Sequence, residues 1–386
     1  MPLIKTERKY GPLVDAVMLA ACAAVGWFGT QFLLSAPTGP VIVASQTIPG
    51  REAVHDGMAW VPGGDFLMGS DSQQANANER PAHRVRVRGF WMDVTNVTND
   101  EFAAFVAQTG YITTAERQPD WDTIRVQLPP GTPEPDEGLL VPGAMVFTGT
   151  RAPVRLDENW RWWRFVPGAS WRHPQGPGSN IDGKGDHPVV QVSYEDAQAY
   201  AKWAGKRLPT EAEWEFAARG GMDQATYTWG DELTPNGQKQ ANYWDETEGV
   251  FPQVGAGMQI RAPGTRPVKT YPENGYGLYD MTGNAWQWVA DWYRADFFAH
   301  QARQADRDTP IIDPKGPSDS YDPSDPVALA TAPRRVIRGG SFLCNENFCS
   351  SYRPSARRGV DPYRPMSHLG FRLVKDAGPG YVIAAQ

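Results

Sequence analysis

The chain has 386 residues, enough for about two average domains, with 41% hydrophobic and 21% charged residues and a net charge of −7. This is the balance of an ordinary soluble protein, and the negative charge argues against binding to nucleic acid, so no nucleic-acid partner is expected. The 15 tryptophans, 39 glycines and 34 prolines are high counts, which predict a loop-rich fold with a core built on large aromatic rings.

The N-terminal segment has the pattern of a membrane signal. Basic residues within the first nine positions precede an apolar run over residues 16–34, which as a helix would reach ~28 Å and nearly match the ~30 Å hydrocarbon core of a bilayer. Basic residues beside an apolar segment favour the cytoplasmic side of the membrane, so the N-terminus is expected there. The rest of the chain is then expected to be exported, on the periplasmic or extracytoplasmic side. We predict that residues 1–40 are a signal anchor, which would attach the chain to the membrane, or a cleaved signal peptide. Residues 41–57 then form a linker.

The folded domain is expected to begin near Met58. Residues 65–69 are a short strand candidate, and the alternating Arg-Val-Arg-Val of residues 84–87 predicts a half-buried strand. A capping box at 98–101 opens a helix with one apolar face, and Gly110 ends that helix.

Regular elements return after a long stretch rich in proline, glycine and tryptophan. In that stretch we interpret the tryptophans as packing residues: Trp160, Trp162, Trp163 and Trp171. Residues 189–192 then predict a strand. Caps at Ser193 and Thr210 open two helices, which end at Gly205 and Gly220.

Three cysteines are too few for a disulfide framework, and Cys22 lies in the apolar N-terminal run. Cys344 and Cys349 are five residues apart, and several arginines near them favour the thiolate form: Arg353, Arg357, Arg358 and Arg372. Two thiolates with few other donors suit a soft ion such as Cu(I). On the residues alone, a single structural disulfide explains the pair equally well.

The segment around these cysteines resembles the formylglycine-generating enzymes, also called sulfatase-modifying factors. The motifs that carry the resemblance here are GGSFLC, YRPSARR and SHLGFR, within residues 339–372. Three earlier blocks resemble the same family in the same order: MAWVPGGDFLMGSD (58–71), a block at 187–221 that contains KRLPTEAEWEFAARGG, and NGYGLYDMTGNAWQWVADW (274–292). The resemblance therefore covers most of the chain, and the paired cysteines are its specific part.

The resemblance implies an α+β fold: a single compact, loop-rich domain that is similar to C-type lectins and low in regular secondary structure. We expect this catalytic domain over residues 58–378, followed by a tail at 379–386. Members of the family use O2 and copper to oxidise a cysteine in a Cys-x-Pro-x-Arg segment of a sulfatase to formylglycine. The implied partners are therefore sulfatase polypeptides and O2.

The resemblance also implies roles for single residues. Cys344 and Cys349 would hold Cu(I), and Ser341 and Trp286 match active-site residues of the family. Three further positions would contact the substrate, and the last of them has histidine where the family usually has asparagine: Arg353, Arg357 and His368.

The family binds structural Ca2+, and one calcium site has candidate ligands here. They are the side chains of Asp280 and Gln287 and the carbonyls of Gly283 and Ala285. The alternative interpretation of this stretch is a local cap formed by Asp280. A second calcium site at Asn242 lacks its partner, because Ile260 stands where the family has aspartate.

Two other functions on the same fold are alternatives. An iron-dependent sulfoxide synthase would need a histidine cluster, and the six histidines form no His-x3-His-x-Glu motif. They are His55, His83, His173, His187, His300 and His368. In a non-catalytic, C-type-lectin-like binding module, the cysteine pair would be a plain structural disulfide.

Overall fold

The structure is a computed structural model that describes residues 56–377 apart from 246, 248, 256–263, 305–308 and 326–327. The predicted signal segment 1–40, nearly all of the linker 41–57 and the tail 379–386 lie outside the described residues. Within the described part, no helix combines the length and the apolar composition needed to cross a membrane.

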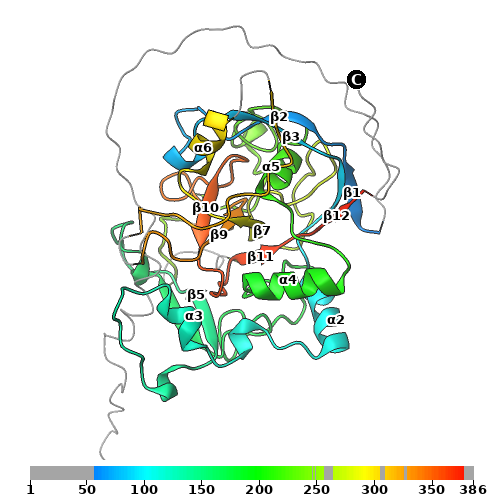
Figure 1. Cartoon of the computed structure of the whole chain (residues 1–386). Helices are drawn as coiled ribbons and strands as arrows, with labels where there is room; N and C mark the ends of the chain where they lie inside the picture. The colour runs from blue at the N-terminus through cyan, green and yellow to red at the C-terminus, as the bar shows by residue number, and fades with distance from the viewer. Residues whose placement is uncertain are drawn as a thin grey trace, which may run out of the picture.

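A four-stranded sheet with the order β10-β9-β7-β11 lies at the centre of the fold (Figure 1). Its strands are β7 (Trp286–Trp292), β9 (Arg335–Arg338), β10 (Arg357–Val360) and β11 (Leu369–Phe371). β9 is antiparallel to both of its neighbours, and β11 is parallel to β7. The cysteine loop, defined here as residues 339–356, connects β9 to β10, so the two paired strands fix both of its ends.

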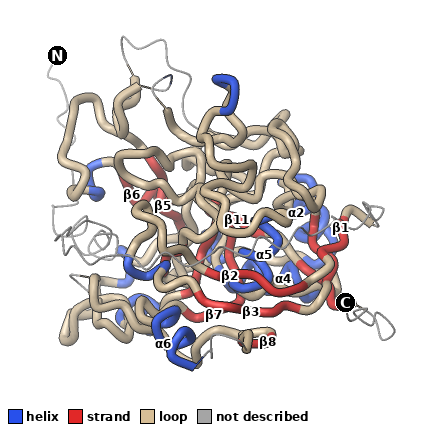
Figure 2. Tube along the Cα trace, turned by 90° about the horizontal axis from the view of Figure 1, so that it is seen from above, coloured by secondary structure: helices blue, strands red, loops and turns tan. Residues whose placement is uncertain are grey.

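Three smaller sheets surround the central one, and loops make up most of the remaining chain (Figure 2). Their strands are β1 (Met58–Val61) with β4 (Phe90–Asp93) and β12 (Val374–Asp376); β2 (Gly64–Met68) with β3 (His83–Val87) and β8 (Ile311–Ile312); and β5 (Gly143–Phe147) with β6 (Trp163–Pro167). The predicted α+β class with little regular structure is confirmed.

The helices are short. The α-helices are α2 (Asn99–Thr109), α3 (Trp121–Arg125), α4 (Tyr194–Trp203), α5 (Glu211–Arg219) and α6 (Phe297–Gln304). The 3-10 turns are Ala77–Glu79, Thr114–Glu116, Glu137–Leu139, Asn159–Arg161 and Pro235–Gly237. The predicted caps at Thr98, Ser193 and Thr210 are confirmed, since each side chain accepts a hydrogen bond from the backbone N–H three residues later.

The predicted strand at 189–192 is wrong. Gln191 has a φ of 62°, which no strand residue adopts, and the segment makes single hydrogen bonds to two different partners. The N–H of Val189 donates to the Val97 carbonyl, and that of Gln191 donates to the Met366 carbonyl. The apolar residues of this segment are buried because the segment passes between other elements of the fold. The periodicity of the sequence cannot distinguish such a segment from a buried strand.

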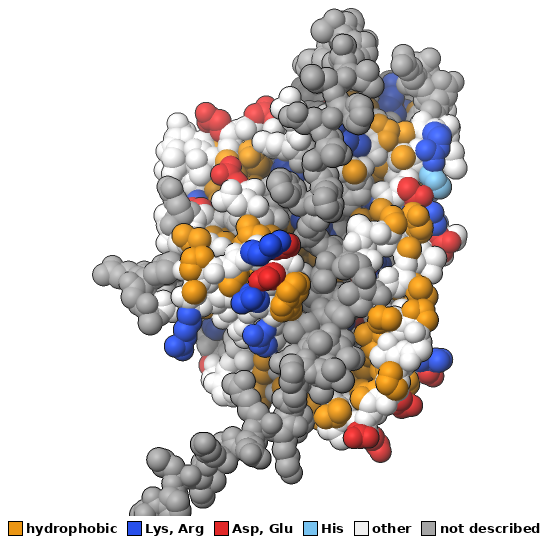
Figure 3. Space-filling view, turned by 90° about the vertical axis from the view of Figure 1, so that its left-hand side faces the viewer, with side chains coloured by type: hydrophobic (Ala, Val, Ile, Leu, Met, Phe, Trp, Pro, Cys, Tyr) orange, Lys and Arg blue, Asp and Glu red, His pale blue; other side chains and the backbone are white. Residues whose placement is uncertain are grey.

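The core is aromatic, as the composition predicts. Trp162 and Trp171 are fully buried and Trp163 is nearly so, whereas Trp160 is 40% exposed and does not serve as a core residue. On the molecular face in Figure 3, acidic and basic side chains lie interspersed among apolar ones.

A buried ion-pair network ties α5 to the central sheet. Arg338, the last residue of β9, donates to Glu211 at 3.0 Å and to Glu215 at 2.6 Å. Arg357, the first residue of β10, donates to both oxygens of Glu211 at 2.6 and 2.7 Å. Burial would raise the pKa of Glu211, but the two guanidinium groups outweigh it and hold that pKa below its ordinary value. The two strand ends that carry the cysteine loop are thus fastened to one helix.

Removing the shared carboxylate should therefore destabilise the protein strongly. Glu211→Gln would leave the buried Arg357 guanidinium without its anion and Arg338 with Glu215 as its one remaining carboxylate, and we expect a loss of about 3–5 kcal/mol in the free energy of unfolding. The matched control is Glu195→Gln, in the exposed pair with Arg117, where water screens the interaction and little change is expected. Denaturant unfolding of the two variants measures this, and equal stabilities would contradict it.

Candidate active site in the cysteine loop

Two glycines start the cysteine loop, and the backbone requires them. Gly339 and Gly340 have φ values of 91° and 71°, in the left-handed region. A Cβ at Gly339 would lie 2.6 Å from the Met281 carbonyl oxygen, and one at Gly340 would lie 2.9 Å from the backbone of Ser351. Only glycine fits this close approach, which turns the chain from β9 into the loop.

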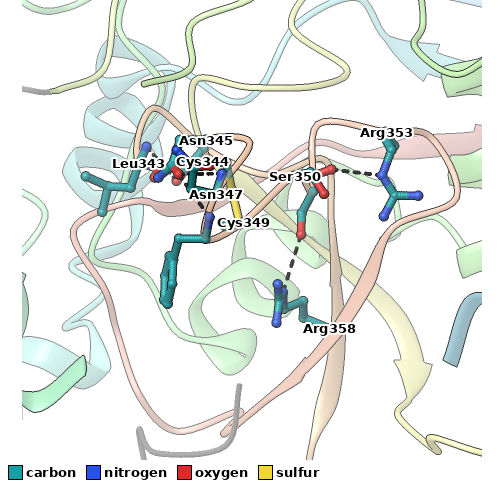
Figure 4. Close-up of a disulfide and its surroundings, with 11 residues drawn as sticks. Leu343, Cys344, Asn345, Asn347, Cys349, Ser350, Arg353 and Arg358 are labelled. Atoms are coloured by element: carbon teal, nitrogen blue, oxygen red, sulfur yellow. Dashed lines mark hydrogen bonds between the residues drawn. A yellow bond between two sulfur atoms is a disulfide. The ribbon is translucent and has the colours of Figure 1, made fainter. Parts of the chain in front are cut away.

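Cys344 and Cys349 lie side by side in the loop and form a disulfide, with Cα atoms 4.6 Å apart (Figure 4). The Asn345 side chain holds the intervening turn, because its Oδ1 accepts from the N–H groups of Asn347 and Phe348 at 3.0 Å each. The N–H of Cys349 closes the turn on the Asn345 carbonyl. In the reduced state this turn would present two thiols at one place.

Aromatic residues enclose the cysteines, which are only 1% and 8% exposed. Trp286, Tyr243 and Tyr352 belong to the same buried cluster as both of them. On the other side of the loop, the Phe348 ring stacks on Phe251 at 5.1 Å and meets Trp162 edge to face at 5.5 Å. The sulfur atoms are thus in an apolar environment with little water.

Ser341 and Trp286, predicted active-site residues, are both at the loop. Ser341 is fully buried, and its carbonyl accepts from the N–H of Cys344 at 3.0 Å. Trp286 opens β7, and its N–H donates to the His368 carbonyl at 2.9 Å. The structure therefore brings Ser341, Trp286, His368 and the cysteines into one region.

Arg353 and Arg357 are also at the loop, but their guanidinium groups are occupied within the fold. Arg353 is 3% exposed and makes two bonds of 2.7 Å to Glu79, while Arg357 is bound to Glu211. Contact with a substrate would require these buried pairs to open. The geometry supports a positioning role for both arginines, and substrate contact by them stays a prediction.

His368 is 8% exposed, and its ring lies 4.8 Å from the Trp163 ring. Its Nδ1 has no hydrogen-bond partner among the described residues. Burial lowers the pKa of His368 to about 3, so the imidazole is neutral at physiological pH. A neutral histidine can donate at one nitrogen and accept at the other, as asparagine does with its amide.

The predicted calcium ligands do not fit calcium at Gln287. Its Oε1 accepts from the Trp214 indole at 2.7 Å and from Arg372 at 2.8 Å, so both lone pairs are used. Its Nε2 donates to the carbonyls of Asp280 and Met281. The amide therefore has no free oxygen lone pair for a cation.

Arg372 already supplies a cation at this place. Burial lowers its pKa to about 10, so the guanidinium remains charged at neutral pH. It donates to the carbonyls of Tyr279 and Asp280 at 2.6 and 2.9 Å, besides Gln287. A second cation nearby would be repelled.

The other predicted calcium residues have local partners. The Asp280 carboxylate accepts from the N–H of Lys269 at 2.9 Å, and burial raises its pKa. The amide nitrogen of Asn242 donates to Asn284 Oδ1 at 3.1 Å. The bond that Gly283 makes to the Gly339 carbonyl, 2.8 Å long, uses its N–H and not the predicted carbonyl ligand. Ala285 is buried before β7, and Ile260 lies outside the described residues. The alternative interpretation, in which Asp280 has a local structural role, is the one that this geometry supports.

Sequence reasoning did not find the partners of the loop. Glu79 and Arg353 are 274 residues apart, and nothing local marks Glu79 as a buried carboxylate. Glu211 and Glu215 are on an amphipathic helix, where glutamate usually faces water. One available signal was the cluster of arginines after the cysteines, which in an apolar loop requires buried anions.

The fold and the loop define a class: a loop-rich α+β domain that carries two adjacent cysteines between paired strands. Residues 45–377 match the sulfatase-modifying factor enzyme 1-like domain, and the chain belongs to this family. It is 46% identical over 325 residues to the formylglycine-generating enzyme of Mycobacterium tuberculosis, covering 83% of this chain and 98% of that protein. The enzyme of the same name from Thermomonospora curvata is 45% identical over 334 residues, covering 85% and 97%.

Membership of the family does not by itself establish activity. A mouse relative named inactive C-alpha-formylglycine-generating enzyme 2 is 35% identical over 329 residues, covering 83% of this chain and 86% of that protein. A proposal about the activity of this chain must therefore rest on the residues of the cysteine loop.

Because the oxygen and nitrogen of the Gln287 amide are both fully hydrogen-bonded, we predict that calcium does not stabilise this protein. A ligand that binds only the native state at a hundredfold excess over its Kd stabilises by about 2.7 kcal/mol, so its removal would lower the melting temperature by several degrees. We expect the purified chain to melt at the same temperature with and without a calcium chelator. A drop that added Ca2+ reverses, and that Asp280→Asn abolishes, would contradict this geometry.

Proposed function

We propose that this chain oxidises a cysteine in a Cys-x-Pro-x-Arg segment of sulfatases to formylglycine, with O2 as the oxidant and copper held by Cys344 and Cys349. The observation that carries the proposal is the adjacency of these two cysteines in a buried loop of this family. Relatives that align over nearly their whole length are named formylglycine-generating enzymes, which supports a role in sulfatase maturation.

The donor set fits Cu(I). Reduction of the pair would leave two soft thiolates at adjacent positions in an apolar cluster, and Cu(I) prefers few, soft ligands. When bound, copper would supply the activation of O2 that the amino acids of the chain do not provide. Two protein ligands would leave room for the thiolate of the substrate.

The residues around the loop have roles that do not depend on the metal. Trp286 and Phe348 exclude water from the sulfur atoms, and Ser341 starts the turn that places Cys344. His368 keeps a neutral ring, and its Nδ1, which is buried and has no partner among the described residues, would be able to bond a substrate only if the site opened. Arg353 and Glu79 hold the loop in position from the opposite end.

The location of the protein is part of the proposal. We place the catalytic domain on the exported side of the membrane, where the sulfatase substrate would have to meet it. The apolar run over residues 16–34 would place the domain there, attached by a signal anchor or released by cleavage.

A non-catalytic binding module is the second candidate, and the disulfide is the observation that favours it. In that function the disulfide would only stabilise the loop. The iron-dependent alternative has less support, because no three histidine, cysteine or acidic residues gather into a metal group within the described ranges.

Cys344→Ser and Cys349→Ser distinguish these functions. Each variant should lose most copper binding and most turnover, because a hydroxyl is a hard and weakly acidic replacement for the thiolate. The assay incubates a Cys-x-Pro-x-Arg peptide with the enzyme, copper, a reductant and O2, and reads loss of the thiol and gain of an aldehyde by mass. Cys22→Ser is the matched control and should behave like the wild type.

The binding module predicts the opposite pattern. Both loop variants would be less stable by ~2–5 kcal/mol, as expected for loss of a structural disulfide. The wild type would bind no copper and form no aldehyde, and that result would overturn the proposed function.

A further inference from the structure

The two cysteines are closed off from solvent, although any ligand of the pair must reach the sulfur atoms. Cys344 is 1% exposed and Cys349 is 8% exposed. On one side they pack in the large core cluster that includes residues of the central sheet, and buried ion pairs fasten the strand ends of that sheet to α5. Access from this side would require the core to open, so the opposite side of the loop offers the easier route.

A segment without helix or strand covers the opposite side. It comprises residues 249–254 and is called the strap here. Val250 is 63% exposed and Phe251 is half-buried, so the strap separates the interior from solvent. The Phe251 ring stacks on Phe348 at 5.1 Å, and Phe348 directly precedes Cys349 in the loop. The strap therefore lies over the loop beside its second cysteine.

Aromatic contacts hold the strap on the loop, and they converge on one side chain. The ring centre of Phe251 lies near those of Phe348 at 5.1 Å, Trp244 at 5.3 Å, Trp162 at 5.7 Å and Phe147 at 6.1 Å. Such pairs stabilise the closed arrangement. Because all of them involve Phe251, displacement of this one ring would release the strap from the loop.

The backbone of the strap is held at one point. Among the described residues outside the strap, only Thr150 bonds to it from backbone to backbone. The N–H of Thr150 donates to the Pro252 carbonyl at 2.9 Å, and its carbonyl accepts from the N–H of Val254 at 2.8 Å. A segment with so few backbone hydrogen bonds can open locally, at a free energy well below that of global unfolding.

Trp244 connects the strap to the cysteine pair. Its indole donates to the carbonyl of Gly249, the first residue of the strap, at 2.8 Å. Its backbone N–H donates to the Cys344 carbonyl at 2.9 Å, and the residue is only 2% exposed. Movement of the strap away from the loop would break the indole bond, so this bond acts as a latch.

We propose that the strap is a gate over the cysteine pair, in which Phe251 closes the route to the sulfur atoms and Trp244 holds the gate shut. The inference goes beyond the proposed function, because such a gate controls every reagent that must reach the sulfur atoms, whether or not copper binds there. If the proposed function holds, the gate also sets how fast the substrate cysteine meets the pair.

The test measures how fast the reduced, copper-free full chain reacts with iodoacetamide without oxygen, and mass spectrometry assigns the adducts to each cysteine. Phe251→Ala should raise the alkylation rates of Cys344 and Cys349 by about tenfold or more, because the aromatic contacts of the closed state are lost. Trp244→Phe keeps a ring but removes the donor to Gly249, and it should raise both rates by about three- to tenfold.

Tyr276→Ala is the matched control. The Tyr276 ring is half-buried and stacks on Phe216 at 5.7 Å, much as Phe251 stacks on Phe348, but it packs on the core cluster that contains α5 residues and no cysteine. This variant should leave the alkylation rates of both loop cysteines as they are in the wild type. Phe251→Leu retains an apolar side chain and should give rates between those of the wild type and Phe251→Ala.

Low concentrations of urea distinguish the gate from global unfolding. Opening of the strap exposes little surface, so the alkylation rates should change little with urea below the unfolding transition. The inference is overturned if the rates rise with urea as steeply as global unfolding does. It is equally overturned if Phe251→Ala and Phe251→Leu react no faster than Tyr276→Ala.

The outcomes separate this inference from the proposed function. If the gate variants react faster with iodoacetamide but the wild type forms no aldehyde from the peptide, the gate stands and the proposed function fails. If the wild type forms aldehyde but the alkylation rates do not respond to Phe251 or Trp244, the proposed function stands and the gate fails.

Discussion

The shared carboxylate of Glu211 is the interaction on which the cysteine loop depends. Arg338 ends β9, Arg357 begins β10, and both donate to this one side chain on α5. The loop has 18 residues in turns, bends and irregular backbone, so its position depends on the strand ends that this carboxylate holds. Because these charges are buried, their attraction offsets the cost of removing them from water only when the partners are already held in good geometry.

A second ion pair holds the other part of the loop. Arg353, four residues after Cys349, binds Glu79 at two points, and Ser355 donates to the same carboxylate at 2.7 Å. Arg353 and Arg357 thus join the loop to distant segments, which supports a positioning role for both. This arrangement leaves the cysteines to the aromatic cluster.

The local parts of this description could be predicted from the sequence. Capping boxes, helix ends and the strand over 84–87 depend on residues a few positions apart, and these predictions are confirmed. The GGSFLC and SHLGFR motifs place Ser341, Cys344 and His368 in one family-specific region, which the structure brings together.

What the sequence could not supply depends on contacts over long separations. Gln287 looks like a calcium ligand until Arg372, 85 residues later, is seen to occupy its oxygen. The segment 189–192 looks like a strand, although its neighbours in space give it single bonds instead of a ladder. The anions that hold Arg353 and Arg357 are separated from them by 274 and 146 residues, and no local pattern reports such pairs.

The central claim is that the two cysteines of this loop are metal ligands and not a permanent structural disulfide. X-ray absorption at the copper edge, measured on the reduced full chain loaded with one equivalent of Cu(I), tests it directly. The account predicts a low-coordinate copper ion with two sulfur ligands, and loss of one sulfur in either serine variant of Cys344 or Cys349. Copper that has no sulfur neighbours in the wild type, or a pair that stays oxidised under reductant, would contradict it.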